Sequence, residues 1–119
     1  MYNMEEWLYW LYGNLPAYQS NFSKIEQAVK KSDVLITDGT HRIVGLFYNR
    51  GIDDSPRISV QCIRQEVAFA KQVAFNNRIK IITDKELSAS LFSRHNVGDL
   101  LKTDLFRPVA KIYARLKHR

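Results

Sequence analysis

Apolar residues recur every three or four positions in several parts of the chain, which is typical of helices that bury one face. Two of these parts open with a capping box, Ser23–Glu26 and Thr83–Glu86, in which side chains satisfy free N–H groups of the first turn. The spacing therefore predicts a series of short helices. They cover Met4 to Leu11, Ser23 to Lys31, Gln61 to Asn76, Thr83 to beyond Phe92, and the last residues after a cap at Thr103 or Asp104.

Short runs rich in β-branched residues lie between these helices and favour strands. Asp38 and Gly39 form a turn dipeptide of the kind that joins paired strands. The order of the elements predicts an α/β fold, a small mixed β-sheet of about four strands flanked by about four helices. We expect an aromatic-rich, helical segment at residues 1–20 and one domain at residues 21–119. The predicted strands are Val34–Thr37, Ile43–Tyr48, Ile58–Val60 and Ile79–Ile82.

The composition is that of an ordinary globular domain. The chain has 119 residues, of which 45% are hydrophobic and 25% are charged. No apolar run approaches the ~20 residues of a membrane span, and a lone cysteine, Cys62, favours a reducing compartment. We therefore expect a cytoplasmic protein. Cys62 falls at the start of a predicted helix beside Arg64, where it is either a reactive thiol with a lowered pKa or, as we favour, a buried apolar residue.

The net charge of +6 comes from the end of the chain. Arg107, Lys111 and Arg115 form an outward stripe at helical spacing in the last predicted helix, whose inward positions include Leu105, Val109, Ile112 and Leu116. This basic stripe is either a solvated helix face or a surface for nucleic acid, anionic lipid or an acidic protein. A small basic nucleic-acid-binding protein is therefore the alternative function. Tyr113 is the aromatic residue among these basic positions that could stack on bases, but the helical spacing turns it toward the core, which counts against this alternative.

The sequence offers little for metal or enzyme chemistry. Its three histidines, His41, His95 and His118, are far apart and match no metal-binding spacing. Glycine-rich phosphate loops and nucleophile motifs are absent from the sequence. We therefore expect no metal, no cofactor and no activity as a diffusible enzyme.

A longer set of residues resembles a known family. Lys31–His41 is similar to the strand and loop of the FlhB/YscU family, whose loop reads Asn-Pro-Thr-His. The resemblance runs from Phe22 to Leu116 and implies the fold of the FlhB/YscU cytoplasmic domain. These proteins are export switches of flagellar and virulence type III secretion systems. The further matching segments are Glu66–Lys71, Arg78–Ile82, Leu87, Leu91–Phe92, Val97–Asp99 and Leu105–Ala110.

Two departures from the family pattern bear on function. Family members carry transmembrane helices ahead of this domain, so the chain is either a stand-alone relative, which Met1 and the aromatic segment favour, or part of a longer protein. In the family, the loop asparagine attacks its own backbone carbonyl and cuts the chain before proline. Asp38 and Gly39 stand at these positions, and a carboxylate has no amide nitrogen for that attack. We expect an intact chain, in which the remaining chemistry is isomerisation by attack of the Gly39 nitrogen on the Asp38 side chain.

The resemblance implies a non-cleaving binding or regulatory module of a type III export apparatus. Its partners would be export substrates, the ruler protein or gate components, at an apparatus to which it is recruited from the cytoplasm. Asp38, Gly39, Thr40 and His41 are the candidate partner-binding residues, although Thr40 and His41 can equally complete the turn and start the next strand. The double substitution Asp38→Asn with Gly39→Pro is expected to restore self-cleavage if the scaffold is intact. The aromatic N-terminus is a candidate for self-association.

Overall fold

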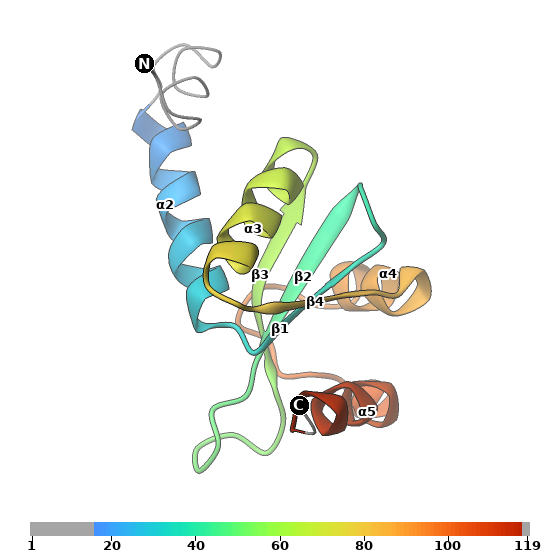
Figure 1. Ribbon diagram of the computed structural model, residues 1–119. Helices are drawn as coiled ribbons and strands as arrows, with labels where there is room; N and C mark the ends of the chain where they lie inside the picture. The colour runs from blue at the N-terminus through green and yellow to red at the C-terminus, as the bar shows by residue number, and fades with distance from the viewer. Residues whose placement is uncertain (1–15, 118–119) are drawn as a thin grey trace.

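The computed structural model describes residues 16–117, in which helices lie on both sides of one sheet (Figure 1). The helix predicted from Met4 to Leu11, with the aromatic residues proposed for self-association, lies outside this range. Within it, no helix combines the length and the apolar character that a membrane span requires. The elements are α2 (Pro16–Lys31), β1 (Val34–Thr37), β2 (Arg42–Phe47), β3 (Arg57–Ile63), α3 (Gln65–Asn76), β4 (Lys80–Thr83), α4 (Lys85–Ser93), the 3-10 turn η1 (Thr103–Leu105) and α5 (Phe106–Lys117).

The strands form one mixed sheet in the order β3-β2-β1-β4. β1 pairs antiparallel with β2, and β2 pairs antiparallel with β3. β4 runs parallel to β1, because α3 carries the chain from one edge of the sheet back to the other. The prediction of a small mixed sheet of about four strands flanked by about four helices is confirmed.

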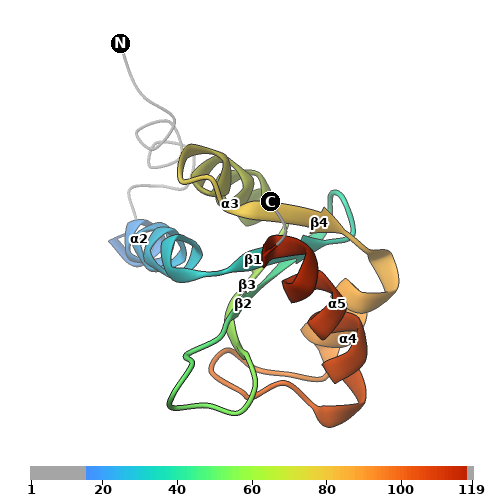
Figure 2. The same cartoon turned by 60° about the horizontal axis from the view of Figure 1, so that its bottom comes forward.

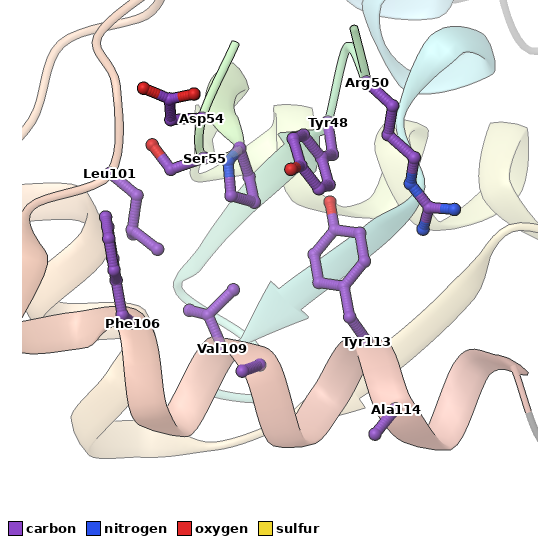
Figure 3. A pocket seen from close by; sticks show the side chains of 11 residues that line it. Tyr48, Arg50, Asp54, Ser55, Leu101, Phe106, Val109, Tyr113 and Ala114 are labelled. Carbon is purple, nitrogen blue, oxygen red and sulfur yellow. The ribbon is translucent and has the colours of Figure 1, made fainter.

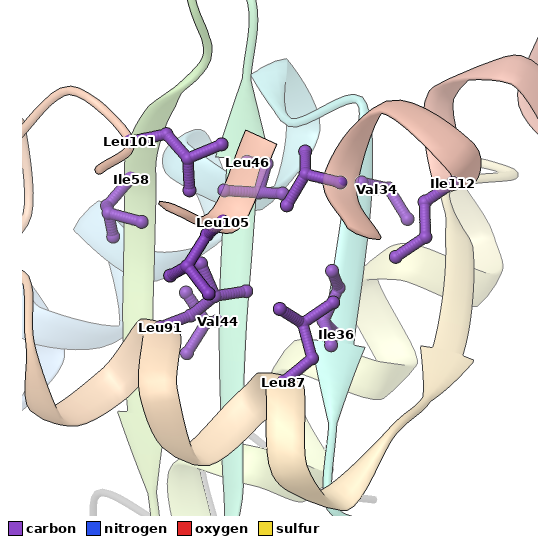
Figure 4. Packing of buried hydrophobic residues seen from close by; sticks show 11 residues of the cluster. Val34, Ile36, Val44, Leu46, Ile58, Leu87, Leu91, Leu101, Leu105 and Ile112 are labelled. Carbon is purple, nitrogen blue, oxygen red and sulfur yellow. The ribbon is translucent and has the colours of Figure 1, made fainter. Parts of the chain in front are cut away.

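Helices cover both faces of this sheet. α2 and α3 lie over one face, and α4 and α5 lie over the other (Figure 2). Because successive residues of a strand point to opposite faces, Val34 and Ile36 join the core under α4 and α5, whereas Leu35 joins the core under α2 and α3. Figure 4 shows the core under α4 and α5, which contains Val34, Ile36, Val44, Leu46, Ile58, Leu87, Leu91, Leu101, Leu105, Val109 and Ile112.

β3 is longer than the sequence pattern predicts. Residues 61–63 have the spacing of a helix start, but they continue β3, where Gln61 pairs with Val44 and Cys62 with Ile43 of β2. α3 begins only at Gln65. The helix predicted from Gln61 is therefore wrong at its first turn, because pairing with a central strand overrides the local pattern.

This longer strand decides between the two interpretations of Cys62. In β3 the side chain is fully buried in the core under α2 and α3. Burial, together with the nearby Glu66 carboxylate, raises the pKa of the Cys62 thiol to about 12. The buried apolar cysteine is confirmed, and the reactive thiol with a lowered pKa is wrong.

α2 begins seven positions before its predicted cap. The helix starts at Pro16 and continues through residues 20 and 21, so Ser23–Glu26 lies inside it. Proline is well suited to the first turn, because the N–H that it lacks has no partner within the helix there. The predicted inward face is confirmed, with Ile25 and Val29 buried.

The caps of the last two helices also differ from those predicted. Asp84 rather than Thr83 caps α4, since its Oδ1 accepts a hydrogen bond from the backbone N–H of Leu87 at 3.0 Å. The chain enters α5 through η1, which has no side-chain cap. Asp104, one of the two caps predicted for the last helix, instead forms a bidentate pair with Arg94.

Candidate functional site

The loop between β1 and β2 is built around the carboxylate of Asp38. Its Oδ1 accepts three backbone hydrogen bonds, from the N–H groups of Thr40 at 3.2 Å, His41 at 2.8 Å and Arg42 at 3.1 Å. Although the loop lies at the surface, only 9% of the Asp38 side chain is exposed. This side chain therefore organises the turn that the Asp38-Gly39 dipeptide predicts.

The same contacts set the ionisation of Asp38. Desolvation raises its pKa, but the N–H groups of His41, Arg42 and Thr40 and the nearby His41 ring outweigh this effect and lower the pKa to about 2. The side chain is thus a carboxylate anion at neutral pH. An anion is a poor electrophile, so attack of the Gly39 nitrogen on this side chain is disfavoured, and with it the isomerisation expected from the sequence.

Gly39 has a backbone conformation that proline cannot adopt. Its φ is +114°, whereas proline holds φ near −65° and has no N–H group. The Gly39 N–H donates to Oγ1 of Thr37 at 3.0 Å, and its carbonyl accepts from the ammonium group of Lys71 in α3. The double substitution by Asn and Pro would have to rebuild this turn, so restored cleavage does not follow from the observed loop.

Thr40 and His41 lie at the exposed tip of the loop. The hydroxyl of Thr40 is 3.1 Å from Nδ1 of His41, and 83% of the His41 side chain is exposed. The backbone of His41 bonds to Asp38 on one side and accepts from the N–H of Arg64 on the other. Both residues therefore complete the turn, and both present their side chains to solvent.

A groove of about 580 Å³ lies at the opposite end of β2 from this loop (Figure 3). One wall is the connection between β2 and β3, and the other is α5. Most of its floor and walls are apolar or aromatic side chains. The lining residues are Tyr48, Arg50, Asp54, Ser55, Pro56, Leu101, Phe106, Val109, Ala110, Tyr113 and Ala114.

Asp33, just before β1, holds the two walls of this groove together. Its Oδ2 accepts hydrogen bonds from the backbone N–H of Tyr48 at 2.7 Å and from the hydroxyl of Tyr113 at 2.8 Å. The two tyrosine rings meet edge to face, with centroids 6.2 Å apart. Burial, followed by the hydrogen bond to Asp33, raises the pKa of Tyr113 well above its usual value, so its hydroxyl stays protonated and donates.

A second contact fixes the connection that forms the other wall. Arg57 binds both carboxylate oxygens of Asp53, at 2.8 and 2.9 Å, and also donates to the carbonyl of Gly98 at 2.8 Å. The hydrogen bond from Arg57 lowers the pKa of Asp53. The groove is therefore held open by bonds within the protein before any ligand arrives.

Sequence reasoning did not find this groove. The helical spacing indicated only that Tyr113 turns toward the core. The residues from Tyr48 to Pro56 were predicted only to connect two strands. The missing information is the contact between segments far apart in the chain, which no local pattern records. The one available signal was the residue type. A tyrosine that packs against the core usually finds a hydrogen-bond partner for its hydroxyl.

The basic stripe lies on the solvent side of α5. Arg107, Lys111 and Arg115 are all exposed, as predicted. Tyr113 is half-buried and bonded to Asp33, and its ring lines the groove rather than lying beside the basic stripe. Tyr113 therefore does not supply an aromatic platform to this stripe.

The two histidines in the described part of the chain, His41 and His95, belong to no cluster that could hold a metal ion. His95 is buried, where Nδ1 lies 3.2 Å from the carbonyl of Leu91 and Nε2 accepts from the N–H of Lys102 at 3.1 Å. His118 lies outside the described residues. Among residues 16–117, no group of three or more His, Cys, Asp or Glu side chains could hold a metal ion.

Similar sequences come from flagellar and secretion proteins. FlhB, the flagellar biosynthetic protein of Buchnera aphidicola subsp. Schizaphis graminum, is 28% identical over 72% of this chain. SsaU, a secretion system apparatus protein of Salmonella typhimurium, is 30% identical over 74% of this chain. The aligned regions make up 23% and 25% of these relatives, respectively, so the chain corresponds to one part of longer proteins.

Solved structures and a family model agree with this similarity. The crystal structure of an EscU C-terminal domain with an Asn-to-Asp mutation matches with a TM-score of 0.75 and 26% identity, over 82% of this chain and 89% of that one. The cytoplasmic domain of FlhB from Shewanella putrefaciens, at 18% identity, has the same fold, with a TM-score of 0.74 over 80% of this chain and 73% of that one. The model of the FlhB HrpN YscU SpaS family matches residues 17–116. This chain therefore belongs to the FlhB HrpN YscU SpaS family.

Proposed function

We propose that this chain is a binding and regulatory module of a type III export apparatus and that its hairpin loop is not cut. Its membership of a family of flagellar and secretion-apparatus proteins supports a role in export. The groove between α5 and the β2–β3 connection carries the binding role, because it is apolar and held open by the protein's own hydrogen bonds.

The occupant that fits this groove is a short apolar segment of an exported polypeptide. Ala110 and Ala114 are exposed on the α5 wall and leave room for large side chains from a ligand. Phe106, which is 39% exposed, offers a ring on which such side chains can pack. Gate components and the ruler protein are further partners of the same module, reached on the cytoplasmic side of the membrane apparatus.

The Asp38 loop supports a module that stays in one state. The carboxylate has no nitrogen with which to attack the backbone, and its three N–H partners hold the side chain in place. A module that is never cut would present a single loop conformation to its partners. It would then regulate export, or compete with a full-length, cleavable relative for the same partners.

Intact mass tests the claim that the chain is not cut. The purified protein is held at neutral pH for several days and is then measured by electrospray mass spectrometry under denaturing conditions. We expect one species with the mass of the whole chain. Two fragments, one ending at Asp38 and one starting at Gly39, would contradict the proposal.

Photo-crosslinking in the native cell tests the binding role of the groove. A photoreactive amino acid is placed at Ala110 in the groove wall and, as the control, at Lys24, which is exposed on α2 over the opposite face of the sheet. We expect Ala110 to crosslink exported polypeptides and Lys24 not to do so. Crosslinks from Ala110 to nucleic acid alone, or to the same proteins as Lys24, would exclude the proposed role.

A further inference from the structure

Two opposite charges stand at the two ends of the groove. Arg50 and Asp54 both belong to the β2–β3 connection, and Figure 3 shows them at opposite ends of the same wall. Phe106, at the start of α5, lies at the Asp54 end, and Ala114, two turns later, lies at the Arg50 end. The groove therefore has a direction, defined by charge on one wall and by helix polarity on the other.

Both charges are available to a ligand. Arg50 and Asp54 are exposed. In the described part of the chain, Asp54 has no hydrogen bond or ion pair, in contrast to the neighbouring Asp53, which Arg57 holds. The guanidinium group of Arg50 lies 5.4 Å from the ring centre of Tyr48. This contact with the ring face places the cation at the groove, and within residues 16–117 no hydrogen bond or ion pair engages its N–H donors.

We infer that Arg50 and Asp54 select an amphipathic helical segment with an acidic residue at its N-terminal end and a basic residue at its C-terminal end, bound antiparallel to α5. This inference rests on the proposed function of the groove. The acidic residue pairs with Arg50, and the basic residue pairs with Asp54, while the apolar face between them packs on Phe106, Ala110 and Tyr113.

Helix electrostatics fix the direction of this segment. A helix has partial positive charge at its N-terminus and is stabilised by an acidic residue there and by a basic residue at its C-terminus. The end of α5 near Arg50 is its C-terminal end. In a segment with its N-terminus at that end, the acidic residue pairs with Arg50 and also stabilises the segment's own helix dipole. The positive N-terminus of the segment then lies beside the negative C-terminus of α5.

The length of the groove sets the spacing of the two charges. Phe106 and Ala114 are eight positions apart on α5, which corresponds to about 12 Å along a helix axis. The matching charges on the bound segment are therefore expected about eight residues apart in a helix, with apolar residues at every third or fourth position between them.

Two synthetic peptides of identical composition test this inference. Both have the same amphipathic apolar centre, and one carries Glu first and Lys about eight residues later, whereas the other carries Lys first and Glu later. Fluorescence anisotropy with the full chain measures their affinities. We expect the Glu-first peptide to bind about tenfold more tightly at low salt, and we expect this preference to shrink as salt screens the charges.

A charge swap provides the matched variant. In the double variant Arg50→Glu, Asp54→Lys, the preference should reverse, and the thermal midpoint should stay that of the wild type because both residues are exposed. The control variant Lys24→Glu, on the other face of the sheet, should keep the wild-type preference. If the double variant does not fold, each single substitution is expected to reduce the preference separately.

The outcomes separate this inference from the proposed function. Equal affinity for the two peptides, or the same preference in the charge-swapped variant, would overturn the role of Arg50 and Asp54 while leaving the groove as a docking site. Tighter binding of the Lys-first peptide would overturn the antiparallel direction. If neither peptide binds, and a peptide with only the apolar centre does not bind either, the docking role of the groove itself is overturned.

Discussion

The carboxylate of Asp33 and the hydroxyl of Tyr113 are joined by a 2.8 Å hydrogen bond, although the two residues are 80 positions apart in the sequence. The same Oδ2 atom of Asp33 accepts from the backbone of Tyr48. One side chain immediately before β1 thus links α5 to the β2–β3 connection. Both residues that Asp33 holds, Tyr48 and Tyr113, line the groove.

Tyr113→Phe is expected to destabilise the domain and loosen α5. The substitution removes the donor to a carboxylate and leaves the ring in place, so the cost is about 1–3 kcal/mol in the free energy of unfolding. Urea denaturation measures this cost, and amide hydrogen exchange should show faster exchange in α5. Tyr48→Phe is the matched control, because Tyr48 reaches Asp33 through its backbone. Equal effects of the two substitutions would contradict the role of the Tyr113 hydroxyl.

Asp38 should make the stability of the domain depend on acid pH. Its pKa is lowered from an ordinary value of 3.8 to about 2 in the fold, so its contribution is complete above about pH 4 and is lost as the pH falls through about 2. Asp38→Asn keeps an acceptor oxygen but does not titrate. We expect the stability of the wild type relative to Asp38→Asn to fall over this range in urea titrations at several pH values. Asp54→Asn, at an exposed carboxylate, is the control, and parallel pH profiles of wild type and Asp38→Asn would refute the prediction.

Gly39→Ala should destabilise the domain although it creates no steric clash. A Cβ atom at this position would meet no other atom within 4 Å, but φ is +114°, which strains any residue with a side chain by about 1–3 kcal/mol. Gly39→Pro should lower the free energy of unfolding further, because it also removes the N–H that donates a hydrogen bond to Thr37. Urea denaturation of both variants, with Thr40→Ala at the exposed tip as the control, checks the order. A wild-type midpoint for Gly39→Ala would show that the loop relaxes freely.

Cys62 should be inert in the folded protein. Its thiol is buried and has a pKa raised to about 12, so the reactive thiolate is scarce at mildly alkaline pH. We expect no labelling by a disulfide reagent in buffer and complete labelling in denaturant. The variant Cys62→Ala, Ile63→Cys moves the thiol to the next position, where the native side chain is 42% exposed, and should react without denaturant. Rapid labelling of native Cys62 would contradict its burial.

Local patterns predicted those parts of the fold whose causes are local. The hairpin at Asp38 and Gly39 was predictable because the turn residues themselves supply the bonds and the positive φ. The end of β3 was not, because residues 61–63 have a helical pattern and are strand only through pairing with β2. The groove was also out of reach, since the Asp33–Tyr113 bond has no signature in either segment.

The Asp38 loop also bears on how such a domain can change during evolution. The three N–H groups of the loop all donate hydrogen bonds to one oxygen of Asp38, Oδ1. Aspartate and asparagine both have this oxygen. The second carboxylate atom, Oδ2, faces only the side chains of His41 and Arg42, at 3.5 and 3.7 Å. Replacing that one atom by a nitrogen, or a nitrogen by that atom, leaves the hairpin with the same anchor. A single substitution at position 38 can therefore exchange the carboxylate for an amide while the three N–H bonds to Oδ1 are kept.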